Sequence, residues 1–150
     1  MILTRQAILA EAMEWLGTPY HHCACVKGIG VDCAMFFVGI AKALGTLSSD
    51  WEPPFYTPQW HLHQKNPLYT MILEKVGCVP ISIEASEPGD IVVFRWEPWQ
   101  PASHGALLLP QKSILHARHH PVPGRGKVRR EPFAAYQRYI AGAYAWPGVI

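Results

Sequence analysis

The spacing of hydrophobic residues changes once along this chain, from a helical period to short β-rich runs. Apolar residues recur at helical spacing over residues 4–16, 33–44 and 69–76, and a glycine follows each run. After Pro88-Gly89 the β-rich runs are separated by prolines and glycines; they cover residues 90–95, 104–109, 113–118 and 139–145. This order predicts an α+β fold with N-terminal helices packed on an antiparallel β-sheet.

Helix-capping residues stand where the helical runs begin. Thr4 precedes the first run, Asp32 precedes the second, and Asn66 with Pro67 forms an N-cap and N1 pair before the third. Between the helices, residues 17–31 and 46–65 are rich in glycine or proline, so we expect irregular loops there.

Length and composition indicate one globular domain over residues 1–150. Apolar residues make up 49 % of the chain and charged residues 16 %, which excludes intrinsic disorder. The net charge of +2 is too small to indicate nucleic acid as a partner. We expect the basic segment 124–131 (GRGKVRRE) to be a solvated strand or loop without a functional role.

No stretch has the length and apolarity of a signal peptide or a membrane span, since Glu11 and Glu14 interrupt the N-terminal apolar residues. We therefore expect a chain that is made in the bacterial cytoplasm and does not insert into a membrane. Its four cysteines are then expected to be free thiols.

The segment VDCAMFF is the strongest local signal of chemistry. Cys33 opens a predicted helix directly after Asp32. The free N–H groups and the macrodipole at a helix N-terminus favour a thiolate and offer donors for an oxyanion. A lone cysteine is more often a small buried apolar residue, so a general base is needed to support a catalytic role.

Two histidines on neighbouring predicted strands supply such a base. His104 begins the run HGALLL, and His116 lies in the run SILHAR. A hairpin around residues 110–112 would bring the two imidazoles near the same end of the sheet. The sequence thus offers a nucleophile, a base and a polar residue to orient it, although a single histidine near a strand end is more often structural.

The motifs together resemble those of the NlpC/P60 cell-wall cysteine peptidases. The resemblance is carried by WLGTPYHHCACVKGIGVDC, PGDIVVFR, SHGALLL and SILHAR, in that order along almost the whole chain. It is strongest to the branch associated with phage tails and gene-transfer particles. It implies a papain-like NlpC/P60 fold and hydrolysis of peptidoglycan stem peptides, with the bond between D-glutamate and a diamino acid as the target.

The resemblance also implies roles for single residues. Cys33 matches the nucleophile, His104 the general base and His116 the residue that orients the base. Tyr20 matches a tyrosine near the oxyanion, and Asp32 an acidic residue that meets the substrate amine. Both also have ordinary structural interpretations, as a packing tyrosine and a helix cap. No cofactor is implied.

The sequence departs from the family pattern on both sides of the nucleophile. Ala34-Met35 stands in place of a Ser-Gly pair, and HHCACVKGIG replaces a glycine-rich segment. Neither change removes a residue that matches a catalytic group, so we expect the departures to alter the shape of the cleft more than the chemistry.

Three alternative interpretations remain open at this stage. A zinc-dependent hydrolase would use ligands from His21, His22, Cys23 and Cys25, with His104 and His116 added. A non-enzymatic tail or scaffold component would bind a partner through Trp51, Trp60, Trp96 and Trp99. A third alternative keeps the enzyme and changes the bond, because this type of fold also hosts amidases and acyltransferases.

Without an export signal, the protein would need an assembly to reach the cell wall. Phage-tail or secretion-apparatus proteins are the expected partners, and a phage tail is the favoured route.

Overall fold

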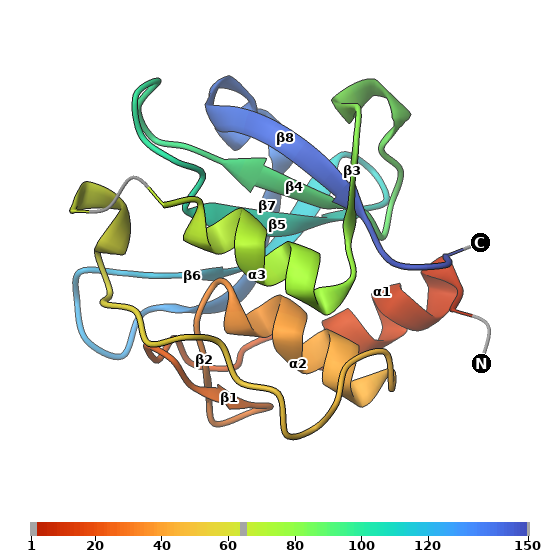
Figure 1. Ribbon diagram of the computed structural model, residues 1–150, viewed down its shortest axis with the longest axis horizontal. Helices are drawn as coiled ribbons and strands as arrows, with labels where there is room; N and C mark the ends of the chain where they lie inside the picture. Colours follow the sequence, from red (N-terminus) through yellow and green to blue (C-terminus); the bar gives the residue numbers. More distant parts are fainter. Residues whose placement is uncertain (1–2, 64–65, 150) are drawn as a thin grey trace.

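The computed structural model describes residues 3–63 and 66–149. Three α-helices, α1 (Arg5–Met13), α2 (Met35–Ala43) and α3 (Leu68–Val76), are followed along the chain by most of the strands (Figure 1). The main sheet is antiparallel throughout and its strands lie in the order β3 (Val79–Ile81), β8 (Ile140–Ala145), β4 (Ile91–Phe94), β5 (His104–Leu109), β6 (Ser113–Arg118) and β7 (Lys127–Pro132). The predicted α+β fold is confirmed.

Shorter elements fill the connections. A two-stranded hairpin, β1 (Cys25–Val26) and β2 (Gly30–Val31), lies inside the first predicted loop. The 3-10 turns are η1 (Trp60–Leu62), η2 (Ile83–Ala85) and η3 (Phe133–Tyr139). None of the described helices is long and apolar enough to cross a membrane.

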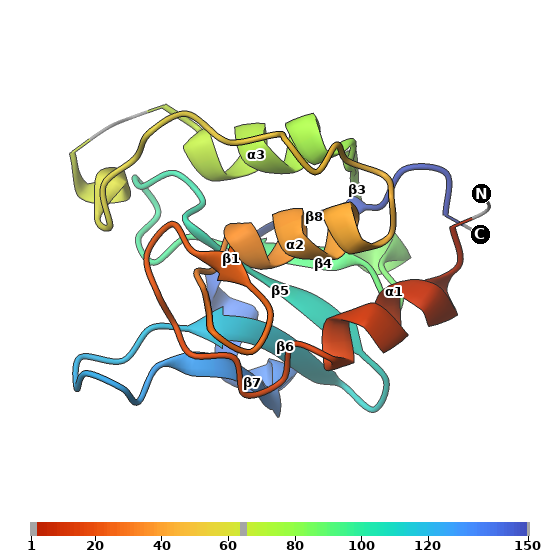
Figure 2. The same ribbon diagram turned by 90° about the horizontal axis from the view of Figure 1, so that it is seen from below.

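The sheet separates two hydrophobic clusters, because neighbouring residues of a strand point to opposite faces. Ile91 and Val93 of β4 face the larger cluster, which the three helices complete; Val92 and Phe94 face a smaller one, which Tyr136 of η3 joins. Figure 2 shows α2 and α3 together on one side of the sheet. Each fully buried large apolar side chain stabilises the fold by about 1.5–3 kcal/mol.

Close packing of α1 on α2 depends on Gly39. A Cβ atom at this position would lie 2.4 Å from Cη2 of Trp15, so only glycine admits the indole. Glycine costs about 1 kcal/mol relative to alanine inside a helix. The packing of Trp15, which is 3 % exposed, offsets that cost.

The predicted element boundaries differ from the observed ones by a few residues. The runs 104–109 and 113–118 coincide with β5 and β6. The first helix ends at Met13 and not at residue 16, because the next residues turn through short 3-10 bonds toward Gly17, whose φ is +85°. The second begins at Met35 instead of Cys33, and the third at Leu68, with Pro67 as its N-cap.

The basic segment 124–131 forms most of β7, in agreement with the expected strand or loop. Strand β3 and the hairpin of β1 and β2 were not predicted, since each is only two or three residues long. The stretch 46–63 is irregular apart from η1, as expected; Gln64 and Lys65 at the end of that predicted loop lie outside the described residues.

Candidate active site

Cys33 lies between β2 and α2 and lines a cavity of about 1070 Å³. Its Sγ donates to the carbonyl oxygen of Ser103, 3.7 Å away, directly before β5. Its own carbonyl oxygen accepts a hydrogen bond of 2.8 Å from the hydroxyl of Tyr69 in α3. The thiol is therefore held between the helical layer and the start of β5.

The place of Tyr69 depends on Gly105. A Cβ atom at Gly105 would lie 2.6 Å from the Tyr69 hydroxyl oxygen, a distance that Cβ atoms essentially never show. A glycine within a strand often marks a place where another element approaches closely. Here α3 occupies that space, so that Tyr69 reaches Cys33.

Asp32 is buried, with 2 % of its surface exposed, and accepts hydrogen bonds on both oxygens. Oδ1 accepts from the backbone N–H groups of Ala34 (3.1 Å) and Met35 (2.8 Å) at the start of α2. Oδ2 accepts from the N–H of Cys23 (2.8 Å) and from the hydroxyl of Tyr56. The predicted capping role is confirmed, and the same carboxylate ties two loops to the helix that follows Cys33.

His104 and His116 are in direct contact, as the hairpin predicted. Nε2 of His104 lies 2.7 Å from Nδ1 of His116, and Nε2 of His116 lies 2.8 Å from Oε2 of Glu131 in β7. Tyr136 donates its hydroxyl proton to the same Glu131 oxygen. Both rings are buried, with 6 % and 0 % exposure.

The hydrogen-bond chain assigns the tautomers. Because the Glu131 carboxylate only accepts, Nε2 of His116 carries the proton and Nδ1 of a neutral His116 is an acceptor. Nε2 of His104 is then the donor, and Nδ1 of a neutral His104 keeps its lone pair. His104 lines the cavity together with Cys33, so a base and a thiol open onto the same cavity.

Burial favours the neutral forms of the Cys33 thiol and the His104 imidazole. Burial, and then the negative charge of Asp32, raise the pKa of the Cys33 thiol, against the effect of a hydrogen bond from Tyr20. Burial, and then His116 and Arg118, hold the pKa of His104 well below its ordinary value. The thiolate expected from the helix N-terminus is thus disfavoured, because the Asp32 carboxylate takes the N–H groups of Ala34 and Met35.

Tyr20 also lines the cavity, and it lies close enough to Cys33 for the two side chains to affect each other's pKa. Burial, followed by the charge of Cys33, raises the pKa of Tyr20, so its hydroxyl remains a donor. Among the described residues, no acceptor meets hydrogen-bond geometry with the backbone N–H of Cys33, which lies near the Tyr20 oxygen and the Cys33 sulfur. This N–H and the Tyr20 hydroxyl are therefore the available donors for an oxyanion.

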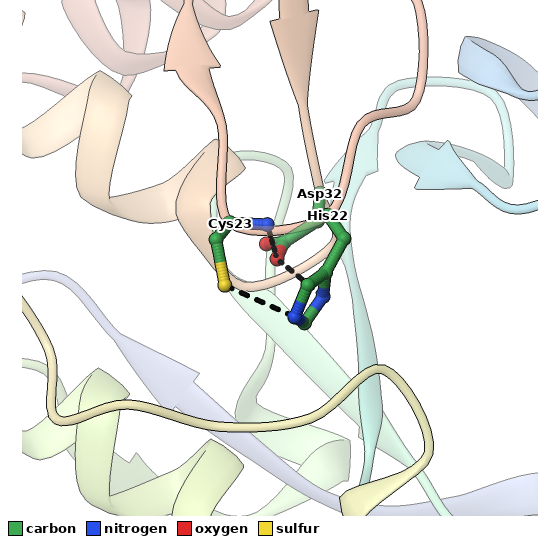
Figure 3. Close-up of side chains that lie close together, drawn as sticks. All are labelled: His22, Cys23 and Asp32. Atoms are coloured by element: carbon green, nitrogen blue, oxygen red, sulfur yellow. Dashed lines mark hydrogen bonds and ion pairs between the residues drawn. The ribbon is translucent and has the colours of Figure 1, made fainter.

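The proposed zinc ligands do not come together as a set. In the described part of the chain, the group with metal-ligand spacing is His22, Cys23 and Asp32, whose ligand atoms lie within 4.8 Å of one another (Figure 3). Four protein donors already occupy the two Asp32 oxygens, which leaves no lone pair for a cation. Cys25 turns away and donates to the carbonyl oxygen of Met35 at 3.4 Å.

The tryptophans proposed to bind a partner mostly pack inside the protein. Trp60 is 5 % exposed, Trp51 packs against the main core, and Trp96 stacks on His104 with ring centroids 5.6 Å apart. Trp99 is 78 % exposed. A surface formed by all four is not present.

Sequence reasoning missed Glu131, Tyr69 and Tyr56. The alternation of β7 places Glu131 on the face of His116, diagonal to its direct partner Arg129, but no sequence pattern sets the register of this strand pair. Tyr69 was assigned only to an apolar helix face. Tyr56 lies in the irregular stretch 46–63, where no periodic signal exists.

Solved structures share this architecture. An NlpC/P60 family protein from Bacillus cereus superposes with a TM-score of 0.64 and 19 % identity, over 95 % of this chain and 40 % of that one. The NlpC/p60 domain of the peptidoglycan hydrolase SagA superposes with a TM-score of 0.57 and 21 % identity, over 94 % of this chain and 97 % of that one. NlpC1 from Trichomonas vaginalis superposes with a TM-score of 0.61 and 16 % identity, over 94 % of this chain and 44 % of that one.

These similarities show that the chain has the papain-like NlpC/P60 fold. It spans less than half the length of the Bacillus cereus and Trichomonas vaginalis proteins. No family model matches the sequence, and no curated protein matches it.

Replacing Glu131 by glutamine tests its control of the histidine pair. The amide can donate as well as accept, so it no longer specifies Nε2–H on His116, and we expect the rate of any reaction that uses His104 as its base to fall about 10- to 100-fold. Steady-state kinetics would measure the loss, with Glu52→Gln at an exposed position as the charge-matched control. Unchanged kinetics in Glu131→Gln would show that the carboxylate is dispensable.

The lowered pKa of His104 makes the fold sensitive to acid. The unfolded chain binds a proton to this histidine below about pH 6.5 and the folded chain does not, so stability present at higher pH is lost as the pH falls. Between pH 7.5 and 5.5 the free energy of unfolding should drop by about 1.4 kcal/mol more in the wild type than in His104→Phe. Urea denaturation of both proteins at the two pH values measures these decreases in the free energy of unfolding. Equal decreases in the wild type and His104→Phe would contradict the lowered pKa of His104.

Proposed function

We propose that this chain is a member of the NlpC/P60 family and a cysteine hydrolase that cleaves peptidoglycan stem peptides. One observation carries the proposal: Cys33 and the end of a Glu131–His116–His104 hydrogen-bond chain line the same cavity. The shared fold with a peptidoglycan hydrolase domain supports the substrate class.

The first step is attack of Cys33 Sγ on the scissile carbonyl carbon. The thiol leaves the Ser103 carbonyl oxygen and turns to Nδ1 of His104. This nitrogen takes the thiol proton as the C–S bond forms. The N–H of Cys33 and the hydroxyl of Tyr20 stabilise the oxyanion. Proton transfer coupled to attack suits a thiol whose pKa burial has raised.

The imidazolium formed on His104 is stabilised through its contact with His116. Nε2–H of His104 remains bonded to His116, which in turn remains bonded to the negative charge of Glu131. His104 then gives its proton to the leaving amine, which releases the first product and leaves an acyl-enzyme. Water, deprotonated by the same Nδ1, attacks the acyl carbon and restores the free thiol.

The target bond in this proposal lies between D-glutamate and a diamino acid, on the strength of the motifs around Cys33, His104 and His116. The substrate contact of Asp32 also belongs to the proposal. Its oxygens are engaged by protein donors, so a substrate amine would have to replace the Tyr56 hydroxyl.

Delivery by a phage tail or a secretion apparatus is supported by the resemblance of the motifs to the phage-tail branch. In such an assembly, local cleavage of the wall would open a path for DNA. The exposed side chains of Phe55 (88 %) and Trp99 (78 %) offer apolar contacts to neighbouring proteins.

Digestion of purified peptidoglycan tests the proposed activity. The wild type should release peptide fragments that end at D-glutamate, as read by mass spectrometry, and Cys33→Ala should release none, because no other group at this position can form the acyl-enzyme. A chelator should leave the wild-type rate unchanged. Cys78→Ala, which removes a buried thiol that does not line the cavity, is the matched control.

Fragments that persist with Cys33→Ala, or that disappear only with the chelator, would contradict the cysteine mechanism. A folded wild type that releases nothing from peptidoglycan would contradict the proposed substrate.

A further inference from the structure

Side chains that can carry a positive charge dominate the lining of the cavity. Seven of the eight histidines of the chain line it: His21, His22, His61, His63, His104, His119 and His120. Among the described lining residues Asp32 is the one acidic side chain, and it is buried with both oxygens occupied. The cavity therefore holds many N–H donors and no accessible carboxylate of its own.

Arg118 is the permanent cation of this lining. It ends β6, two residues after His116, and its guanidinium carbon lies 5.8 Å from the ring centroid of Tyr136. Within residues 3–63 and 66–149, no salt bridge or side-chain hydrogen bond includes this guanidinium. An arginine fork beside a catalytic pair is thus left without an anion.

The neighbouring strand adds a second positive charge. Lys127 of β7 lies directly opposite Arg118 in the register of the two strands. Like charges in this position destabilise a sheet, so the pair favours an anion bound beside it. Glu131, the acidic residue of β7, does not supply that anion, because His116, Tyr136 and Arg129 already engage it.

Two histidines beside Arg118 complete a set of donors. Nδ1 of His120 accepts from the N–H of Val122 at 3.0 Å, so the proton of a neutral His120 sits on Nε2 and is available to a ligand. His119 packs edge-on against Tyr20, with centroids 5.3 Å apart. The basic group is thereby continuous with the tyrosine next to Cys33.

We propose that Arg118, with His119 and His120 beside it, binds a free carboxylate of the peptide substrate. The inference rests on the proposed peptidase function and names the feature of the peptide that this site selects. A planar guanidinium binds a carboxylate through two parallel N–H···O bonds. Arg118 follows His116 by about 7 Å along the strand, so the carboxylate belongs to a residue that flanks the scissile bond.

Peptides that differ only in charge test this site. A soluble stem-peptide fragment is compared with versions in which each free carboxylate in turn is a carboxamide. The wild type should cleave one amidated version at least 10-fold less efficiently, as kcat/KM, and Arg118→Gln should lose that discrimination and cleave the amidated and free peptides with equal kcat/KM. Arg118→Lys should give a ratio of kcat/KM for the free and amidated peptides between those of the wild type and Arg118→Gln. Lys112 is exposed at the other end of the same hairpin, so Lys112→Gln should keep the wild-type ratio.

Binding to Cys33→Ala separates this proposal from the hydrolytic one. Calorimetry should give at least 10-fold weaker binding for the same amidated peptide, and adding Arg118→Gln should remove the difference, even if the wild type cleaves nothing. Cleavage without any carboxylate preference would overturn the carboxylate site and leave the proposed function standing. The carboxylate site would also be overturned if Arg118→Gln still discriminated between the free and amidated peptides. The same holds if Cys33→Ala bound all the peptides equally or bound none of them.

Discussion

The buried carboxylate of Asp32 holds together the part of the molecule around Cys33. It accepts hydrogen bonds from the start of α2, from the backbone of Cys23 and from Tyr56, so three segments of the chain meet at one charge. A buried charge without such partners costs several kcal/mol, and each hydrogen bond to a charged group contributes about 1.5–3 kcal/mol. Cys33 is the next residue, so the same interactions fix its backbone.

The charge that caps the helix also sets the chemistry. It raises the pKa of the adjacent Cys33 thiol in addition to the effect of burial, so a resting thiolate and imidazolium pair is disfavoured. In the proposed mechanism, Cys33 therefore depends on a base that accepts its proton during attack. The chain from Glu131 through His116 provides it, because it leaves the lone pair of His104 on Nδ1.

Much of this arrangement could be predicted from the sequence. The helical and β-rich runs indicated the fold class, and the hairpin of β5 and β6 placed His104 against His116 because its register follows from a short turn. To predict the contribution of Glu131, one would have to know how β6 pairs with β7 across a longer loop. To predict that of Tyr69, one would have to know how α3 packs over Gly105, which no local pattern encodes.

The protonation state of the two imidazoles tests the central claim most directly. Nitrogen-15 NMR of histidine-labelled protein at pH 7.5 distinguishes a protonated ring nitrogen from a bare one. The hydrogen-bond chain predicts that His116 and His104 are both neutral, each with its proton on Nε2 and a bare Nδ1. A proton on Nδ1 of a neutral His104 would contradict the account, because that nitrogen could not accept the proton of Cys33.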